Sequence, residues 1–561
     1  MRKPLRVVGL VLATLLASNL AAEPLPEVTP ARLNAGNAPA GDWLSYGGNY
    51  ANWRYSPLQQ INRDNASKIV PVWTLQTGIP GQVAGSPLIA DGTLYFTAAH
   101  NNLYALDART GAIRWHYEHQ MPSDLRICCG PANRGVALAG NRVFMATLDA
   151  RLIAFDRANG HVLWNVAMAD YQAGYSASGA PLVVRDMVVV GSAGGEFASR
   201  GFIDAYNTAD GKRRWRRYTV PAAGETGAET WRGDSWKAGG APAWVTGIYD
   251  PTRNLLYWST GNPSPLFNGD ARSGDNLYSD SVLALDPDTG ALRWHFQTTP
   301  HDVWDYDATN NLVLLDVQLA GKTVRAVAQA NRNGYLYLLE ASTGAFLRGA
   351  PYVEKLNWSS GLTEKGRPIV NPQFMPSAAG LKDFVCPGAL GGNNGSFSYA
   401  YNPTTRRLYI PVIESCMSLT KESPEVRSGA ASFGGSIGDT DGTAGHAAYG
   451  QLTAIDPVTG TVQWRYRDPY PLVGGALATG GGLIFTGNQQ GFALALDDRT
   501  GRVLWQYQMG AGMRSQPMTF RLDNRQYVAI GSGSGGPLVA YVGQPPLRGQ
   551  GSALTVFALP R

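Results

Sequence analysis

The sequence predicts an all-β protein built as a single eight-bladed β-propeller, and three observations support this prediction. A short pattern recurs seven times: an apolar strand led by Ala or Leu, an acidic or Asn turn, a Gly, and a second strand that ends in a large apolar residue, usually Trp. Consecutive Trp residues lie about one four-stranded blade apart wherever no long loop intervenes. The C-terminal strand, Ala553–Leu559, is placed to complete a blade that begins near the N-terminus.

Each copy of the pattern predicts a β-hairpin, because Gly supplies the positive φ that a tight turn needs. Repetition of one supersecondary unit indicates stacking, since no single unit buries its own apolar face. Trp73 is a degenerate eighth member, and the copy at Leu338–Leu347 has lost its Trp. The other copies are Ala105–Trp115, Ala154–Trp164, Ala205–Trp215, Ala284–Trp294, Ala454–Trp464 and Ala495–Trp505.

The first residues predict a secretory signal peptide over residues 1–22. Basic residues precede an apolar run, Val7–Leu16, which is too short to span a bilayer and is followed by small residues up to Ala22. Its removal takes away three of the five net positive charges. The sequence shows no basic patch that would predict binding to nucleic acid or to a membrane surface. We therefore expect a periplasmic protein, with residues 23–41 as a loosely held N-terminal arm and residues 42–561 as the propeller.

The four cysteines form two unlike pairs. In an oxidising compartment both pairs are expected to form disulfides, and Cys386 with Cys416 has the spacing of an ordinary loop staple. A bridge between Cys128 and Cys129 closes a strained ring, which persists only where the surroundings enforce it. The alternative for this pair is two free thiols that are adjacent in a loop.

Several cofactor classes are excluded by missing motifs. The chain has no CxxCH for covalent haem, no HExxH or paired CxxC for zinc, and no GxGxxG after a strand for a dinucleotide. Any redox cofactor must therefore bind through other residues.

The segment His301–Asn310 gathers three aspartates around Trp304 and Tyr306. If the segment is extended, Asp305 and Asp307 point the same way, and two such carboxylates repel unless they share a proton or a cation. A solvated acidic loop is the alternative. Glu196 and Asn262 follow apolar strands of other blades, and together these residues predict an all-oxygen metal site at the propeller mouth.

The sequence resembles the pyrroloquinoline quinone (PQQ)-dependent alcohol dehydrogenases, the methanol and ethanol dehydrogenase group, over essentially the whole mature chain. Cys128-Cys129-Gly130, followed by Asn133-Arg134-Gly135, is similar to the adjacent-Cys ring that packs on one face of the quinone in that family. Trp244 matches the aromatic residue that stacks on the opposite face. A planar cofactor between a disulfide ring and an indole is held by dispersion and shielded from water.

The resemblance also implies a role for each matching residue. Asp305 corresponds to the catalytic base, Arg332 to the arginine that hydrogen-bonds the reactive quinone oxygens, and Asn394 to a further polar contact, although its local spacing differs by one residue. Arg134 and Ser178 correspond to positions that hold the cofactor's carboxylates. The implied metal ligands are Glu196, Asn262 and Asp305.

Asp307 bears on the identity of the metal ion. In the family that this chain resembles, an Asp two residues beyond the catalytic Asp marks the lanthanide-dependent members. A trivalent ion of high coordination number benefits from one more carboxylate than a divalent ion does. We therefore favour a lanthanide(III) ion, with Ca²⁺ as the alternative, because some sugar-oxidising quinoproteins carry a similar acidic pair.

Three positions depart from the family pattern. Ala84 stands where many members have Glu, Ala193 where a Ser helps the cofactor carboxylate, and Val473 where a Trp is common. These changes lead to the hypothesis of a roomier pocket for an alcohol larger than methanol. A clear preference for methanol over a bulky secondary alcohol would contradict it.

The implied function is oxidation of primary or secondary alcohols to aldehydes or ketones. Asp305 takes the alcohol proton while hydride passes to a quinone polarised by the ion. Because the chain has no haem motif, a soluble cytochrome c is the expected electron acceptor; both a monomer and a homodimer remain open. The alternatives are a PQQ-dependent sugar or polyol dehydrogenase and a non-catalytic propeller scaffold.

Overall fold

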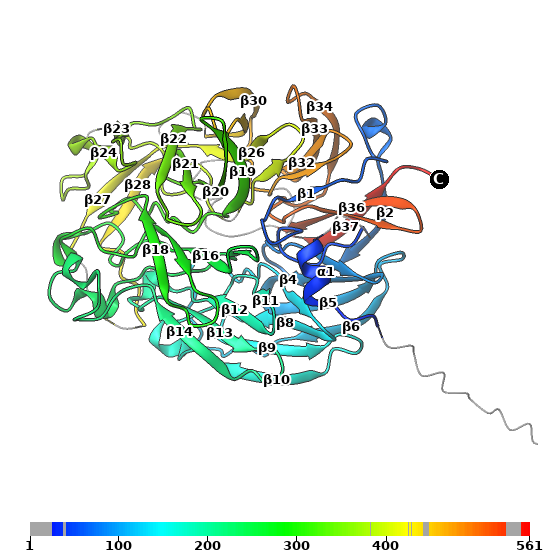
Figure 1. Ribbon diagram of the computed structural model, residues 1–561, viewed down its shortest axis with the longest axis horizontal. Coiled ribbons are helices and arrows are strands. Elements are labelled where there is room, and N and C mark those ends of the chain that lie inside the picture. Colours follow the sequence, from blue (N-terminus) through cyan, green and yellow to red (C-terminus); the bar gives the residue numbers. More distant parts are fainter. Residues whose placement is uncertain are drawn as a thin grey trace, which may run out of the picture.

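The computed structural model describes residues 25–36, 41–381, 383–395, 397–423, 426–427, 429–440, 448–533 and 551–561. Eight four-stranded antiparallel blades stand side by side in a ring (Figure 1), as the repeats predict. The predicted signal peptide, 1–22, lies outside the described residues.

The first four blades follow the chain in order, each strand pairing with the next. They are β3 (Leu88–Ala90), β4 (Thr93–Ala98), β5 (Asn102–Asp107) and β6 (Ile113–Glu118); β7 (Ala137–Ala139), β8 (Arg142–Ala146), β9 (Arg151–Asp156) and β10 (Val162–Ala167); β11 (Leu182–Val184), β12 (Met187–Gly191), β13 (Phe202–Asn207) and β14 (Arg213–Tyr218); and β15 (Ile248–Asp250), β16 (Leu255–Ser259), β17 (Ser281–Leu285) and β18 (Leu292–Gln297).

The other four blades include insertions and the chain ends. They are β19 (Val313–Leu319), β20 (Lys322–Ala330), β21 (Tyr335–Glu340) and β22 (Phe346–Pro351); β25 (Ala400–Asn402), β26 (Arg407–Glu414), β29 (Tyr449–Ile455) and β30 (Val462–Asp468); β31 (Leu477–Thr479), β32 (Leu483–Gly487), β33 (Phe492–Asp497) and β34 (Val503–Gln508), with β1 (Tyr55–Ser56) added in parallel to β31; and β35 (Met518–Leu522), β36 (Arg525–Gly533), β37 (Ser552–Ala558) and β2 (Val70–Gln76).

Two small sheets and several short 3-10 helices lie in the connections. The sheets pair β23 (Ser359–Leu362) with β24 (Pro368–Val370) and β27 (Met417–Lys421) with β28 (Gly435–Thr440). The 3-10 helices are Ala66–Lys68, Ala99–Asn101, Tyr171–Ala173, Gly195–Phe197, Ala228–Thr230, Ser235–Ala238, Asp270–Arg272 and Pro372–Phe374.

The ring is closed by strands from the two ends of the chain. β2 pairs antiparallel with β37 (Figure 1). In this pairing Trp73 lies opposite Val556. This confirms the prediction that the C-terminal strand completes a blade begun near the N-terminus. Closure leaves no blade at the end of an open row, where its apolar face would lack a neighbour.

The Trp residues join each blade to the next one. The indole N–H of Trp294, for example, donates to the backbone oxygen of Ala341 in the following blade at 3.0 Å. The indole also covers the turn glycine of that blade: a Cβ on Gly344 would lie 2.5 Å from the ring. The same indole-to-glycine contact is made by Trp73, Trp115, Trp164, Trp215 and Trp464 on Gly111, Gly160, Gly211, Gly290 and Gly501.

These glycines therefore have two roles, of which the sequence predicted one. All of them have positive φ, between 70° and 77°, as expected for the turn. In addition, each leaves out the Cβ that would collide with the indole. Where one blade has lost its Trp, Gly460 of the following blade faces Ala350 and the guanidinium of Arg348 instead.

Replacing Gly290 by Ala is expected to lower the free energy of unfolding by about 1–3 kcal/mol more than replacing Gly321 by Ala. Both glycines have positive φ (70° and 78°), but a Cβ at Gly290 would lie 2.6 Å from Trp215, whereas nothing lies within 4 Å of one at Gly321. Gly321→Ala thus measures the backbone strain alone. Urea unfolding of the two variants gives the difference, and equal losses would show that the indole contact carries no packing constraint.

The segment expected to be a loosely held arm is in fact packed where the structure describes it. Helix α1 (Pro30–Ala35) begins after Thr29, whose side chain accepts from the Arg32 amide. Val28 and Leu33 are buried, and Arg32 forms ion pairs with Asp42 and Asp91 at 2.8 and 3.0 Å. Composition alone missed this, because a few apolar and charged side chains in a Pro- and Ala-rich tract are sufficient to anchor it.

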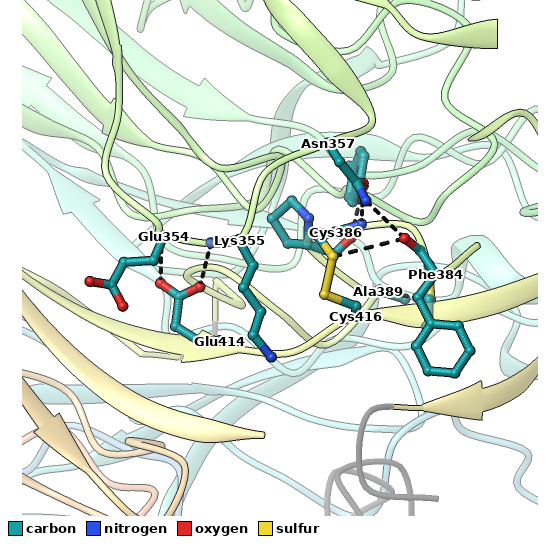
Figure 2. The surroundings of a disulfide bond; sticks show 11 residues. Glu354, Lys355, Asn357, Phe384, Cys386, Ala389, Glu414 and Cys416 are labelled. Atoms are coloured by element: carbon teal, nitrogen blue, oxygen red, sulfur yellow. Dashed lines mark hydrogen bonds between the residues drawn. A yellow bond between two sulfur atoms is a disulfide. The ribbon is translucent and has the colours of Figure 1, made fainter. Parts of the chain in front are cut away.

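The predicted disulfide between Cys386 and Cys416 is present (Figure 2). It joins the loop before Asn394 to the residues that follow β26. The Asn357 side chain accepts from the Cys386 amide at 2.7 Å and donates to the backbone oxygen of Phe384 at 2.8 Å. The bridge and these hydrogen bonds therefore hold the loop that precedes Asn394 in place.

Among the described residues, no helix has the length and apolar character needed to cross a membrane.

Candidate active site

One cavity collects nearly all the residues that the sequence analysis selected. Its lining comes from different blades and their connections, and the predicted residues on it are up to 266 positions apart in sequence, from Cys128 to Asn394. The predicted residues on it are Cys128, Cys129, Arg134, Ser178, Glu196, Trp244, Asp305, Asp307, Arg332 and Asn394. Asn262 is the predicted residue that is not part of the lining; it lies directly behind Asp307.

Cys128 and Cys129 form a disulfide between adjacent residues. The alternative of two free thiols is therefore wrong. Gln82 donates to the backbone oxygen of Cys129, and a carboxylate oxygen of Glu196 lies within 4.8 Å of both sulfur atoms. Because the sulfur atoms are joined to each other, they are not thiolate ligands, and the ring presents a rigid, apolar surface to the cavity.

Trp244 lies on the same cavity and already carries a planar group on its face. The Arg134 guanidinium carbon is 4.4 Å from the centre of the indole, and its Nη1 donates to Ser178 Oγ at 2.7 Å. A Cβ on Gly395 would come within 3.1 Å of the indole, so the glycine lets the chain approach Trp244 closely. The indole is thus positioned as a stacking platform.

The three aspartates of 301–310 have different roles. Asp302 is fully buried and accepts from the amides of Trp304 and Tyr306 at 2.9 and 2.8 Å, so it shapes the loop and does not face the cavity. Asp305 has φ 64°, and the segment is therefore not the extended strand that we expected. The alternative of a solvated acidic loop is also wrong, because Asp307 is buried and Asp305 is largely buried.

Arg332 brings the other two aspartates together. Its Nη1 donates to the backbone oxygen of Asp305 at 2.7 Å and lies 3.3 Å from the Asp305 carboxylate, while its Nη2 donates to Asp307 at 3.0 Å. Burial raises the pKa of Asp305 well above its usual range; the Arg332 charge opposes this shift and the Asp307 charge adds to it. The arrangement therefore holds two acidic groups close together around one guanidinium.

Asn262 touches this cluster through its backbone. Its amide donates to Asp307 Oδ1 at 2.9 Å, and a Cβ on the preceding Gly261 would lie 2.0 Å from the same oxygen. The side-chain oxygen of Asn262 is buried and has no hydrogen-bond partner among the described residues. A buried amide oxygen without a donor is suited to a cation, since leaving it unmatched costs about 1–3 kcal/mol.

Glu196 completes the acidic side of the cavity. It sits in the 3-10 helix Gly195–Phe197, directly after Gly194, whose missing side chain allows the close approach of Gly174. Burial raises the pKa of Glu196 to about 7, and the negative charge of Asp307 contributes to the rise. A cation bound beside Glu196 would oppose this rise, because it favours the charged carboxylate.

The structure adds two charged residues that the sequence analysis missed. Asp280 is fully buried; neither carboxylate oxygen has a hydrogen-bond partner among the described residues, and burial with the charges of Asp302 and Asp307 raises its pKa well above the usual range. Arg514 lies on the cavity lining. Neither residue belongs to a motif, so only the fold reveals its position.

The three departures from the family pattern do not lie together. Ala193 is on the cavity lining. Val473 is buried in a small apolar cluster with Phe397 and Ile413, and Ala84 is buried outside the lining. Of the three, Ala193 is therefore the substitution in direct contact with the cavity.

The residues present fit a flat, anionic cofactor beside a cation. A disulfide ring and an indole offer two apolar surfaces, Arg134 with Ser178 offers donors for carboxylates, and Asn262 offers an unmatched oxygen to an ion. The buried Nδ2 of Asn394 also has no partner among the described residues and can donate to a ligand.

Comparison with known proteins identifies the family. Residues 43–351 and 363–528 match the family described as "PQQ: Glucose/ethanol/alcohol dehydrogenase, beta-propeller domain". The chain belongs to this family. It is therefore a PQQ-dependent quinoprotein dehydrogenase, and the resemblance noted in the sequence is confirmed. The alternative of a non-catalytic scaffold is set aside.

Individual relatives agree over most of the chain. The quinoprotein alcohol dehydrogenase PedH of Pseudomonas putida is 42% identical over 537 residues, covering 91% of this chain and 89% of the relative. The lanthanide-dependent methanol dehydrogenase of Methylacidiphilum fumariolicum is 36% identical, covering 88% and 85%. The solved structure of a europium-containing methanol dehydrogenase superposes with a TM-score of 0.88 at 33% identity, covering 94% of this chain and 99% of that one.

Proposed function

We propose that this protein oxidises alcohols in the periplasm with PQQ and a metal ion, and that Glu196, Asn262, Asp305 and Asp307 hold the ion. The single observation that supports this best is the contact between Asn262 and Asp307. Through its backbone amide, Asn262, whose buried side-chain oxygen has no partner among the described residues, lies against Asp307 on the wall of the cavity that contains Trp244 and the Cys128–Cys129 ring.

The oxygen donors suit a hard cation. Carboxylates and an amide oxygen are the ligands that calcium and lanthanide ions prefer, and neither thiolate nor imidazole lies among them. Three acidic groups on one cavity wall favour a trivalent cation over a divalent one. We therefore propose a lanthanide(III) ion, with Ca²⁺ as the alternative. The lanthanide-dependent and europium-containing relatives support the same choice.

We assign to Asp305 the role of the base that accepts the proton of the alcohol. Of the two aspartates on Arg332, Asp305 has the more exposed side chain, at 18% against 6% for Asp307, and it can be reached from the cavity. A carboxylate that can be reached in this way can accept the proton of the alcohol as a general base. When bound, PQQ and the ion supply a polarised carbonyl that accepts a hydride.

The other cavity residues position and shield the reactants. Arg332 fixes the Asp305 carboxylate and offers donors toward the cavity centre. Cys128, Cys129 and Trp244 exclude water from both faces of the cofactor, while Arg134, Ser178 and Asn394 orient its polar edge. Excluding water strengthens each of these interactions.

Electron acceptor and location are further parts of the proposal. The chain has no CxxCH motif, so a separate carrier must take the electrons one at a time, and we assign this role to a soluble cytochrome c. A periplasmic location agrees with the expected signal peptide over residues 1–22 and with the two disulfides. Assembly as a monomer or homodimer fits the proposal equally well.

The test is dye-linked oxidation by the apoprotein after addition of PQQ and either europium or calcium. We expect activity with PQQ and europium on primary and secondary alcohols, and little or none when either component is omitted. Methanol, benzyl alcohol, 2-butanol, glucose and glycerol distinguish the substrate classes. Activity confined to glucose or glycerol would favour the sugar or polyol alternative, and inactivity on every substrate with both ions would overturn the proposal.

A further inference from the structure

Arg514 is a buried cation on the cavity wall to which the family resemblance assigns no role. It lies in the connection between β34 and β35 and is 9% exposed. Its side chain lines the same cavity as Arg134, Ser178 and Trp244. A guanidinium on a cavity lining offers charged N–H donors to an anionic ligand.

The backbone holds Arg514 in a fixed place. The Met513 amide donates to Asn488 at 3.1 Å, the Ser515 backbone oxygen accepts from Gly475 at 3.1 Å, and Ser515 Oγ donates to the Gly531 oxygen at 2.8 Å. Met513 and Ser515, on either side of Arg514, are fully buried. The guanidinium is therefore presented to the cavity by a rigid segment and not by a surface loop.

The cavity has an acidic part and a basic part. Arg332 binds both Asp305 and Asp307, whereas Arg134 and Arg514 are two more guanidiniums on the same lining. Burial, with the like charge of Arg134, lowers the pKa of Arg514 to about 10. Two guanidiniums on one cavity lining offer charged donors to the same anion.

We propose that Arg514 binds carboxylates of PQQ together with Arg134. This inference rests on the proposed function and adds a cofactor-binding residue to it. PQQ is a planar polycarboxylate, and a guanidinium offers paired donors in one plane that match a carboxylate. Ala193, on the same lining, offers no side-chain donor, so the carboxylate-binding role falls on the two arginines and Ser178.

The test compares Arg514→Gln, Arg514→Lys and the control Arg502→Gln in the full mature chain. Arg502 is an exposed arginine in the hairpin between β33 and β34, so its replacement removes the same charge from the neighbouring blade without touching the cavity. PQQ binding to the europium-loaded apoprotein is measured by quenching of tryptophan fluorescence. Loss of a charge-assisted hydrogen bond should weaken binding roughly 10- to 100-fold in Arg514→Gln, with a smaller loss in Arg514→Lys and none in the control.

Thermal unfolding with and without PQQ is a second measurement. It distinguishes a residue that binds PQQ from a residue that only supports the fold. Without PQQ, the melting temperatures of the wild type and Arg514→Gln give the baseline for each protein. With saturating PQQ, the wild type should gain more in melting temperature than the variant does. A variant that is destabilised equally with and without PQQ, or that binds PQQ as tightly as the wild type, would overturn the assignment.

Failure of the proposed function gives a different result. If the wild type itself does not bind PQQ, both the proposed function and the role of Arg514 are wrong. If the wild type and the control bind PQQ and Arg514→Gln binds equally well, only the role of Arg514 is wrong.

Discussion

Replacing Asp305 by Asn is expected to lower alcohol oxidation about 10²- to 10⁴-fold, the usual loss when a general base is removed. The change keeps the shape of the side chain but removes the charge that accepts the proton. Arg332 still has the backbone oxygen of residue 305, at 2.7 Å, and Asp307 as partners, so the loop should keep its conformation. The measurement is the dye-linked rate at saturating PQQ, ion and alcohol.

Two controls separate loss of chemistry from loss of structure. PQQ affinity and melting temperature of Asp305→Asn should stay close to those of the wild type. Asp316→Ala, an exposed aspartate on β19 that also pairs with an arginine, should keep full activity. A variant Asp305→Asn that retained more than about a tenth of the wild-type rate would contradict the assignment of Asp305 as the base.

Replacing Asp307 by Ala is expected to weaken lanthanide binding far more than calcium binding. At the same distance a trivalent ion gains about one and a half times as much Coulomb energy from a carboxylate as a divalent ion does. We expect roughly a 100-fold loss for europium and roughly 20-fold for calcium, which shifts the preference of the site by about a factor of five. Europium luminescence and competition with calcium measure both affinities.

The structure explains why Asp307 should discriminate between ions. Its Oδ1 accepts from the Asn262 amide and its Oδ2 from Arg332, so the carboxylate cannot turn away from the site. Asp316→Ala again serves as the matched control, because it removes one charge at the surface. Equal losses of europium and calcium affinity in Asp307→Ala would reduce this residue to a support for Asn262 and Arg332.

The sequence predicts the fold well because the fold is made of local units. Each turn glycine and each Trp is recognisable within a single hairpin, and the spacing alone orders the blades. The contact between Trp294 and Gly344 was not predictable in detail, since it joins neighbouring blades. The packing of Val28 and Leu33 was missed for the same reason: it depends on a surface that exists only after the ring forms.

The candidate site was predictable where residues belong to motifs and not elsewhere. Cys128, Trp244 and Asp305 belong to short patterns that the resemblance recognises, and the structure places them on one cavity. Asp280 and Arg514 have no such pattern; their importance comes from burial, which depends on distant segments. The φ of 64° at Asp305 was also unpredictable, because an aspartate adopts this conformation only in a particular loop.

The most direct test of the metal site is anomalous diffraction from crystals of the protein reconstituted with PQQ and europium, recorded at the europium absorption edge. We predict an anomalous peak bounded by the Asn262 side-chain oxygen and the carboxylates of Glu196, Asp305 and Asp307, with PQQ density between Trp244 and the Cys128–Cys129 ring. A europium peak confined to surface carboxylates, with none beside Asp307, would contradict it.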